Sequence, residues 1–420
     1  MSDAEPALAE AVELPGLPGG GEPMRGPGAA LLWACFLGCS WTWVIGMFLP
    51  VMLLRDYGVW GWVAFAVPNV LGAAAMGTVL RTPEASWRLV QQHGPMLRGF
   101  ASVTIAYQVF VVSWLFEGLW WPAVCLLLLV PWLVMDGPRK RRLGSWLPWV
   151  AVGVALVSFG AFSSAGRLDG AWLDVREDVL PSRLSPLALG LLTPGLIVGF
   201  ALCPYLDPTF HRARFRTSPG TGAAAFAVGF VGVFGSMIVF SLMYAGLLRP
   251  VVDGEASVSS LSPPWQALLL IHVGLQVGFT LLVHGRERFG GGGERRVGGF
   301  AGLLVAAVAL GMWASTGPAL LDGLTLGEVV YRLFLLAYGA VFPAYVLICM
   351  VPTLRRGCGA DAKLRRLVFV NTSLLAYPLG AQGFIVGPAW WLLGLYAAIV
   401  GGRLVVEIGP KRRWRDETET

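Results

Sequence analysis

Residues 185–217 read SPLALGLLTPGLIVGFALCPYLDPTFHRARFRT, and this stretch decides the fold. It opens as an apolar run that is too long for a soluble core helix and about long enough to span a bilayer. Gly195, Gly199, Pro204 and Pro208 interrupt the run, which predicts a helix that is broken inside the membrane. A break frees backbone N–H and C=O groups that lipid cannot satisfy. It is tolerated only where protein surrounds it or where it lines a polar cavity.

Asp207 lies beside the second break. One interpretation is a proline-kinked helix whose aspartate marks the membrane surface. The other is a substrate or ion site, because acids within a membrane are costly and usually functional. The sequence leaves both interpretations open.

Composition defines the class of protein. The chain is 56% hydrophobic and 13% charged, with a mean hydropathy of +0.67, so it has more apolar surface than a soluble domain of this length could bury. We therefore expect an all-α polytopic membrane protein whose main partner is the lipid bilayer. The net charge of +6 comes from short basic clusters between apolar runs, as in cytoplasmic loops, and this argues against a nucleic-acid partner.

The apolar runs predict about twelve transmembrane helices. They are 28–54, 59–80, 100–116, 121–135, 146–165, 186–207, 221–248, 264–283, 299–315, 328–351, 367–385 and 388–406. If each run crosses and the N-terminus is cytoplasmic, most of the 31 Lys and Arg residues fall in inner connections. Both termini are thus predicted to be cytoplasmic, and we expect a bacterial cytoplasmic (inner) membrane. Arg332 is expected at the outer interface.

Two interrupted segments suggest an internal repeat. The first carries Gly46 and Pro50, the sixth carries Gly199 and Pro204, and the two cross in opposite directions five segments apart. This is the pattern of a five-plus-five inverted repeat whose broken helices form a binding site. The alternative is chance, because the chain contains 55 glycines. The predicted units are a disordered tail (1–27), a transporter-like domain (28–406; repeats 28–165 and 186–351, extra helices 367–406) and a C-terminal tail (407–420).

Two motifs give a family resemblance. CPYLDPTFHRARFR resembles the sixth core helix of sodium:solute symporters, and the Ser40, Gly46 and Pro50 segment leading into LRDYGVWGWVAF resembles their first. The resemblance implies a LeuT-like fold of the APC transporter superfamily. The adjacent Ser-Thr sodium ligands of that family's eighth core helix are missing from LLLIHVGLQVGFTLLVHG, so the fold is better supported than sodium coupling.

Candidate site residues follow from the breaks and from the eighth segment. The predicted substrate-binding residues are Ser40, Trp43, Gly46, Gly199, Phe200 and Tyr205. The backbone is expected to unwind from Ser40 to Gly46 and from Gly199 to Pro204, and so to offer polar groups to the solute. The predicted coupling or gating residues are Asp207, His272, Gln276 and Thr280, the last three at four-residue spacing on one helix face. His272 can either hydrogen-bond a neighbouring helix or carry protons.

The expected function is a secondary active transporter, a symporter, that moves a small polar solute by alternating access. No enzymatic role and no cofactor are expected, and a coupling ion, if used, would be Na⁺ or H⁺. The four histidines are too scattered to hold haem and copper. The alternative is a sensor or partner subunit that keeps the transporter fold without transporting.

Overall fold

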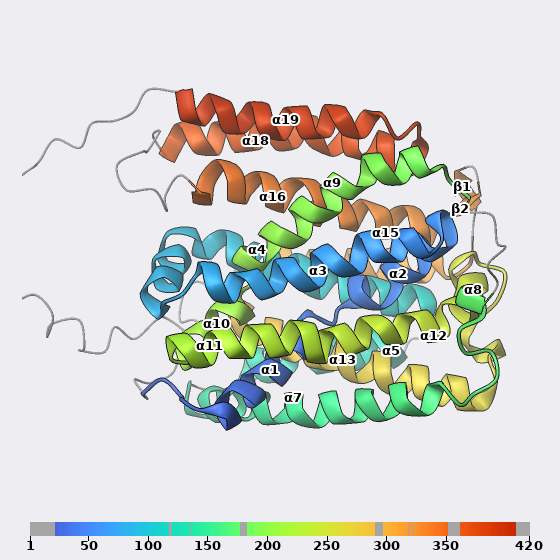
Figure 1. Cartoon of the computed structure of the whole chain (residues 1–420), viewed down its shortest axis with the longest axis horizontal. Helices are drawn as coiled ribbons and strands as arrows, with labels where there is room; N and C mark the ends of the chain where they lie inside the picture. The colour runs from blue at the N-terminus through green and yellow to red at the C-terminus, as the bar shows by residue number, and fades with distance from the viewer. Residues whose placement is uncertain are drawn as a thin grey trace, which may run out of the picture.

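The computed structural model describes residues 22–116, 120–135, 137–176, 183–289, 297–317, 319–321, 323–351 and 362–408. Most helices lie side by side along one direction, α9 crosses this direction obliquely, and α18 packs beside α19 (Figure 1). The α-helices are α1 (Pro27–Trp41), α2 (Val44–Tyr57), α3 (Val59–Val79), α4 (Pro83–Leu115), α5 (Trp120–Leu127), α6 (Val130–Val134), α7 (Gly137–Ala165), α8 (Leu173–Arg176), α9 (Pro186–Leu202), α10 (Pro208–Arg216), α11 (Pro219–Ala227), α12 (Gly235–Val252), α13 (Pro263–Phe289), α14 (Val297–Ala314), α15 (Leu326–Leu336), α16 (Phe342–Tyr345), α18 (Ala362–Ala381) and α19 (Trp391–Ile408).

Shorter elements connect or interrupt these helices. The 3-10 turns are η2 (Cys203–Leu206) and η4 (Val258–Ser260). The π-helical segments are η3 (Val228–Phe234), η5 (Ala337–Val341), η6 (Val346–Met350) and η7 (Gln382–Val386). An antiparallel hairpin pairs β1 (Ala319–Leu321) with β2 (Leu324–Thr325).

The helices have the length and composition of membrane spans. Within the described residues, eight helical stretches are long and apolar enough to cross a bilayer, and α1 with α2 makes a ninth if that pair is counted as one span. Two shorter apolar helices cover Trp121–Val134 and Gly298–Ala314. The expectation of an all-α polytopic membrane protein is confirmed. The count of twelve crossings and the inverted repeat stay predictions.

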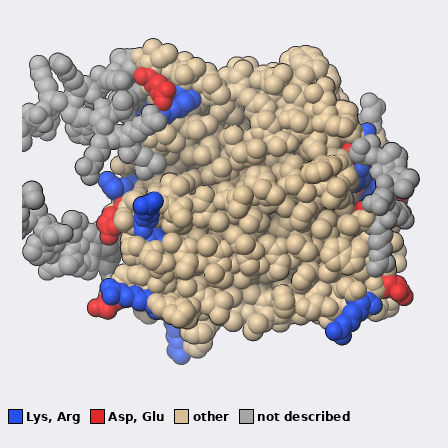
Figure 2. Space-filling view, viewed as in Figure 1, with Lys and Arg blue, Asp and Glu red and all other residues tan. Residues whose placement is uncertain are grey.

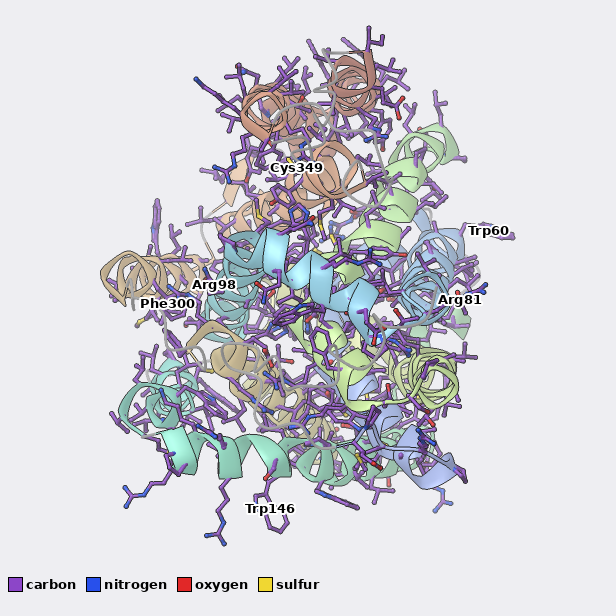
Figure 3. All side chains as sticks on the ribbon, turned by 90° about the vertical axis from the view of Figure 1, so that its left-hand side faces the viewer. Trp60, Arg81, Arg98, Trp146, Phe300 and Cys349 are labelled. Atoms are coloured by element: carbon purple, nitrogen blue, oxygen red, sulfur yellow. The ribbon has the colours of Figure 1, made fainter. Side chains whose placement is uncertain are left out.

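The surface has the charge distribution that a bilayer requires. Figure 2 shows Lys, Arg, Asp and Glu at the two ends of the helices, with an uncharged band between them. Apolar side chains cover this band, and Trp60 and Trp146 point outward in Figure 3, with 70% and 57% of their surface exposed. In lipid this exposure carries no cost, because the surrounding acyl chains are equally apolar.

Polar caps followed by proline begin three of the helices. Thr82, Ser185 and Asp207 each accept a hydrogen bond from a backbone N–H in the first turn of the helix that follows. Proline at the first helical position costs nothing there, since its missing N–H would have no partner within the helix. These caps fix where α4, α9 and α10 begin.

The predicted N-terminal tail is ordered at its end. Residues 1–21 lie outside the described residues, but the Met24 N–H donates to the Arg216 carbonyl at 2.9 Å, and the Ser218 N–H donates to the Met24 carbonyl at 3.1 Å. The prediction of disorder up to residue 27 is therefore wrong for its last residues. At the other end, α19 continues to Ile408, and residues 409–420 lie outside the described range.

Helix α1 packs closely on η3 through small residues. A Cβ atom added at Gly229 would lie 2.8 Å from the Ala34 carbonyl oxygen and 3.1 Å from its Cα. Backbone atoms cannot move aside as a flexible side chain can. The contact therefore requires glycine at this position.

We predict that Gly229→Ala lowers the free energy of unfolding by about 1–3 kcal/mol, because the added methyl group forces α1 and η3 apart. Thermal unfolding of the purified protein measures the change. Gly232→Ala is the matched control, since Gly232 is exposed in the same π-helical segment and its nearest atom would be 4.0 Å away. Equal melting temperatures for the two variants would contradict close packing between α1 and η3.

Candidate functional site

The first helix is broken between α1 and α2. Thr42 and Trp43 separate the two helices, which are bent by 58°. Trp43 has extended backbone angles (φ −91°, ψ 175°), while the Thr42 hydroxyl donates to the Gly38 carbonyl at 2.7 Å. Gly46 and Pro50, the expected interrupting residues, lie inside α2. The break itself falls within the stretch from Ser40 to Gly46 that was expected to unwind.

Aromatic side chains satisfy polar groups at this break. The Trp43 indole N–H donates to the Ser40 carbonyl, and the Trp41 indole N–H donates to Asn69 Oδ1 at 2.7 Å. The two indole rings lie 4.5 Å apart. From α15, the Tyr331 hydroxyl donates to the Val44 carbonyl at 3.0 Å. Freed backbone groups thus find partners within the protein, as an apolar interior requires.

The second interruption follows α9. One 3-10 turn, η2, leads to Asp207, whose backbone is extended (φ −79°, ψ 111°), and α10 begins at Pro208. Gly199 and Phe200 remain in α9, so the predicted unwinding from Gly199 to Pro204 starts only at Cys203.

His211 connects this interruption to α4. Its Nε2 atom lies 2.9 Å from the Tyr205 carbonyl, and its Nδ1 atom contacts the Ser86 hydroxyl. Burial lowers the pKa of His211 to about 4, so the ring is neutral at pH 7. Since a carbonyl oxygen only accepts, Nε2 carries the proton and Nδ1 accepts from Ser86.

The two interruptions meet. The Thr209 hydroxyl of α10 lies 3.2 Å from the Ser40 hydroxyl of α1, and both residues are fully buried. Beside this contact is a cavity of about 80 Å³. It is lined by Trp41, Trp43, Ile45, Gly46, Leu49, Asn69, Leu192, Gly195, Leu196, Gly199, Phe200, Cys203, Leu335, Leu336, Tyr338, Gly339, Phe384, Leu392, Leu395 and Tyr396.

The cavity gathers four of the six predicted substrate residues, namely Trp43, Gly46, Gly199 and Phe200. Ser40 and Tyr205 are not among the lining residues. Ser40 instead donates to the Leu37 carbonyl at 3.1 Å and accepts from Thr209. The lining is mostly aliphatic and aromatic, so the polar wall expected for a polar solute is not present in the described cavity.

The predicted coupling residues of α13 form a buried polar stripe. His272, Gln276 and Thr280 are each fully buried on one helix face. Gln276 Nε2 donates to the Ser158 hydroxyl of α7 at 2.9 Å, and the His272 ring packs 4.9 Å from the Phe240 ring. The stripe continues four residues further at His284, which sequence reasoning missed. The four-residue spacing was the signal that could have found it.

Asp207 is fully buried between α10 and α13. Its Oδ1 atom accepts from the N–H and the hydroxyl of Thr209, both at 2.7 Å, and so caps α10. Its Oδ2 atom lies 3.9 Å from His284 Nε2. Of the two interpretations of Asp207, its full burial within the protein favours a site over a residue on the surface.

A second group of charges, all of them largely buried except Arg183, lies where α2 ends and α15 begins, at the end of the helices nearest α8 and the β-hairpin (Figure 1). Three arginines and three acids form one ion-pair network, which is therefore neutral: Arg55, Asp56, Arg183, Asp253, Glu328 and Arg332. We call it the charge cluster. The side chain of Arg332 is 6% exposed, so it lies inside the protein at this end of the helices rather than on its surface.

The charge cluster ties α2 to α15. Arg55 Nη2 lies 2.6 Å from Glu328 Oε1, and Arg332 Nη2 lies 2.6 Å from both Glu328 Oε1 and Asp56 Oδ2. Arg332 Nη1 also donates at 2.9 Å to the carbonyl of Phe384, a cavity-lining residue. The cluster therefore lies directly beyond the cavity along α2 and α15.

Searches of protein families and of curated proteins found no match to this chain. Within the described residues, no group of three or more His, Cys, Asp or Glu side chains could hold a metal ion. The interpretation of the site rests on its own geometry.

We predict that Glu328→Gln lowers the free energy of unfolding by about 3–5 kcal/mol, because it leaves buried arginines without their counter-charge. Thermal unfolding measures the change. The control is Glu407→Gln, which breaks an ion pair with Arg403 whose acid is 41% exposed, and should cost less than about 1 kcal/mol. A small, equal loss in both variants would contradict the importance of the charge cluster.

Proposed function

We propose that this protein is a secondary transporter that works by alternating access. The observation that carries the proposal is the meeting of two interrupted helices, α1–α2 and α9–α10, beside an internal cavity. Interrupted helices of this kind are the usual walls of transporter binding sites, since they place mobile backbone beside the solute.

The cavity lining favours an apolar or aromatic solute over the polar solute expected from the sequence. Its polar groups are already engaged within the protein. The Tyr396 hydroxyl donates to the Leu191 carbonyl at 2.7 Å and accepts from the Gly195 N–H at 3.0 Å, and Asn69 accepts from Trp41. A polar solute would find few free partners and would lose its hydration on entry.

The volume of the cavity limits the size of the solute. At roughly 10–15 Å³ for each water-sized molecule, a cavity of about 80 Å³ holds a small solute only. Gly195, Gly199 and Gly339 leave space on the wall without side chains. A flat ring or a short branched chain fits this shape better than an extended one.

Two sets of contacts are suited to act as gates. The charge cluster joins α2 to α15 at one end of the bundle. At the other end, Arg212 of α10 forms an ion pair with Glu287 of α13, and Arg214 donates to the Arg81 carbonyl. We propose that one set opens while the other stays closed, so that the cavity faces one side at a time.

A ligand screen tests this proposal. Neutral aromatic and branched aliphatic solutes should raise the melting temperature of the purified protein, whereas sugars should not, because a ligand at about 100 times its Kd adds about 2.7 kcal/mol of stability. Leu196→Trp should abolish the shift by filling the cavity. Ile197→Trp is the control, since Ile197 is the next residue of α9 and is 49% exposed.

Counterflow in proteoliposomes then separates transport from binding alone. The best ligand of the screen should exchange across the membrane in the wild type and in Ile197→Trp, but not in Leu196→Trp. Binding without any exchange would overturn transport and favour the sensor or partner-subunit role. Stabilisation by sugars alone would overturn the assignment of an apolar solute.

A further inference from the structure

We propose that Asp207 and His284 form a proton-binding site, and that the proton is the coupling ion of the transporter proposed above. Coupling rests on that proposed function, but proton binding does not. The site lies where η2 meets α10, against the buried face of α13. Its two members come from helices that would move relative to each other in a transport cycle.

The geometry of the pair leaves room for one proton. Asp207 Oδ1 is occupied as the cap of α10, whereas Oδ2 makes no hydrogen bond within the described structure. Neither ring nitrogen of His284 makes a hydrogen bond of good geometry there, and the backbone of Ser40 is the polar group that interacts with the ring. Oδ2 and Nε2 face each other at 3.9 Å, about 1 Å beyond hydrogen-bond length. A shift of this size brings the two atoms into contact.

The surroundings do not neutralise the carboxylate. The ionisable groups nearest to Asp207 are Cys203 of η2, Glu287 of α13 and Tyr338 of η5. Glu287 is already paired with Arg212. Among the described residues no lysine or arginine pairs with Asp207, and His284 is the one basic group within ion-pair distance. A buried carboxylate without a cation is costly, and a proton removes that cost.

The chemistry of the pair suits a proton better than a sodium ion. Hard cations prefer several oxygen ligands, whereas this site offers one free carboxylate oxygen and an imidazole nitrogen. In the loaded state one proton is held between Oδ2 and Nε2, so the pair has no net charge. When the proton leaves to solvent, a carboxylate and a neutral imidazole remain. No bond other than O–H or N–H changes.

The proposed proton site and the solute cavity are in contact through shared side chains. The Trp43 ring lies 5.4 Å from the His284 ring and also lines the cavity, and Cys203 of the cavity wall lies four residues before Asp207. Closing the gap between Asp207 and His284 therefore moves groups that contact the solute. This contact gives a physical route by which a proton gradient drives accumulation.

The first test needs no substrate. Melting temperature is measured from about pH 5 to about pH 9 for the purified wild type, Asp207→Asn, His284→Gln and His272→Gln. Above about pH 6.5, the ordinary pKa of histidine, the unfolded chain has released its proton from both residues, whereas the folded pair keeps one. Rising pH therefore reduces the folded-to-unfolded ratio of the wild type by up to about tenfold per pH unit. Asparagine still caps α10 but cannot titrate, so Asp207→Asn should lose this dependence.

Two variants complete the test. His284→Gln should weaken the pH dependence or move it to lower pH. His272→Gln, another fully buried histidine of α13, should keep the wild-type slope above about pH 7, where an imidazole is neutral in the folded and in the unfolded chain alike. An Asp207→Asn profile that matches the wild type would overturn the proton site. Equal effects of His284→Gln and His272→Gln would overturn the assignment of His284.

Transport separates this inference from the function it rests on. In counterflow with the best ligand of the screen, Asp207→Asn should exchange solute but fail to accumulate it under an inward proton gradient. Exchange in the wild type with no response to the gradient would overturn proton coupling and leave transport intact. No exchange in any variant would overturn transport, while the pH profiles would still decide the proton site.

Discussion

The structure depends on how backbone groups are satisfied where two helices break in an apolar interior. At Thr42 and Trp43 the partners of backbone carbonyls are the Thr42 hydroxyl, the Trp43 indole N–H and a tyrosine hydroxyl from another helix. At Asp207 the partner is a carboxylate that caps the next helix. At both breaks, the polar side chain that satisfies the backbone lies near the cavity. The hydrogen bonds that folding requires therefore also supply the polar groups of the candidate site.

Buried charge is treated differently at the two polar centres. The charge cluster is neutral as a whole and fully paired, so it can lock α2 to α15 without a standing electrostatic penalty. Asp207 has only His284 within ion-pair distance among the described residues. In the charge cluster, separating one ion pair would leave its partners buried without a counter-charge, so the whole network favours a stable contact. Asp207, which has no such set of partners, is suited to gain or lose a proton when its surroundings change.

Irregular helical geometry is concentrated near the cavity. The π-helical segment η5 carries Tyr338 and Gly339 on the cavity wall, and η7 carries Phe384. A π-helical turn shifts the hydrogen-bond pattern by one residue, and such turns are frequent at functional sites. Together with the breaks after Trp41 and Leu202, they give the cavity wall several departures from regular helical hydrogen bonding.

The sequence by itself determined that the chain is helical and embedded in a membrane, because apolar runs of spanning length have no other stable solution. It also located the region of both interruptions and four of the cavity residues. Only the tertiary structure decided that the first break falls at Thr42 and Trp43, because Tyr331 of the distant helix α15 donates to the Val44 carbonyl there. It also paired Arg55 with Glu328 and Asp207 with His284. Those partners are far apart in the chain, and no local pattern records which side chains helix packing brings together.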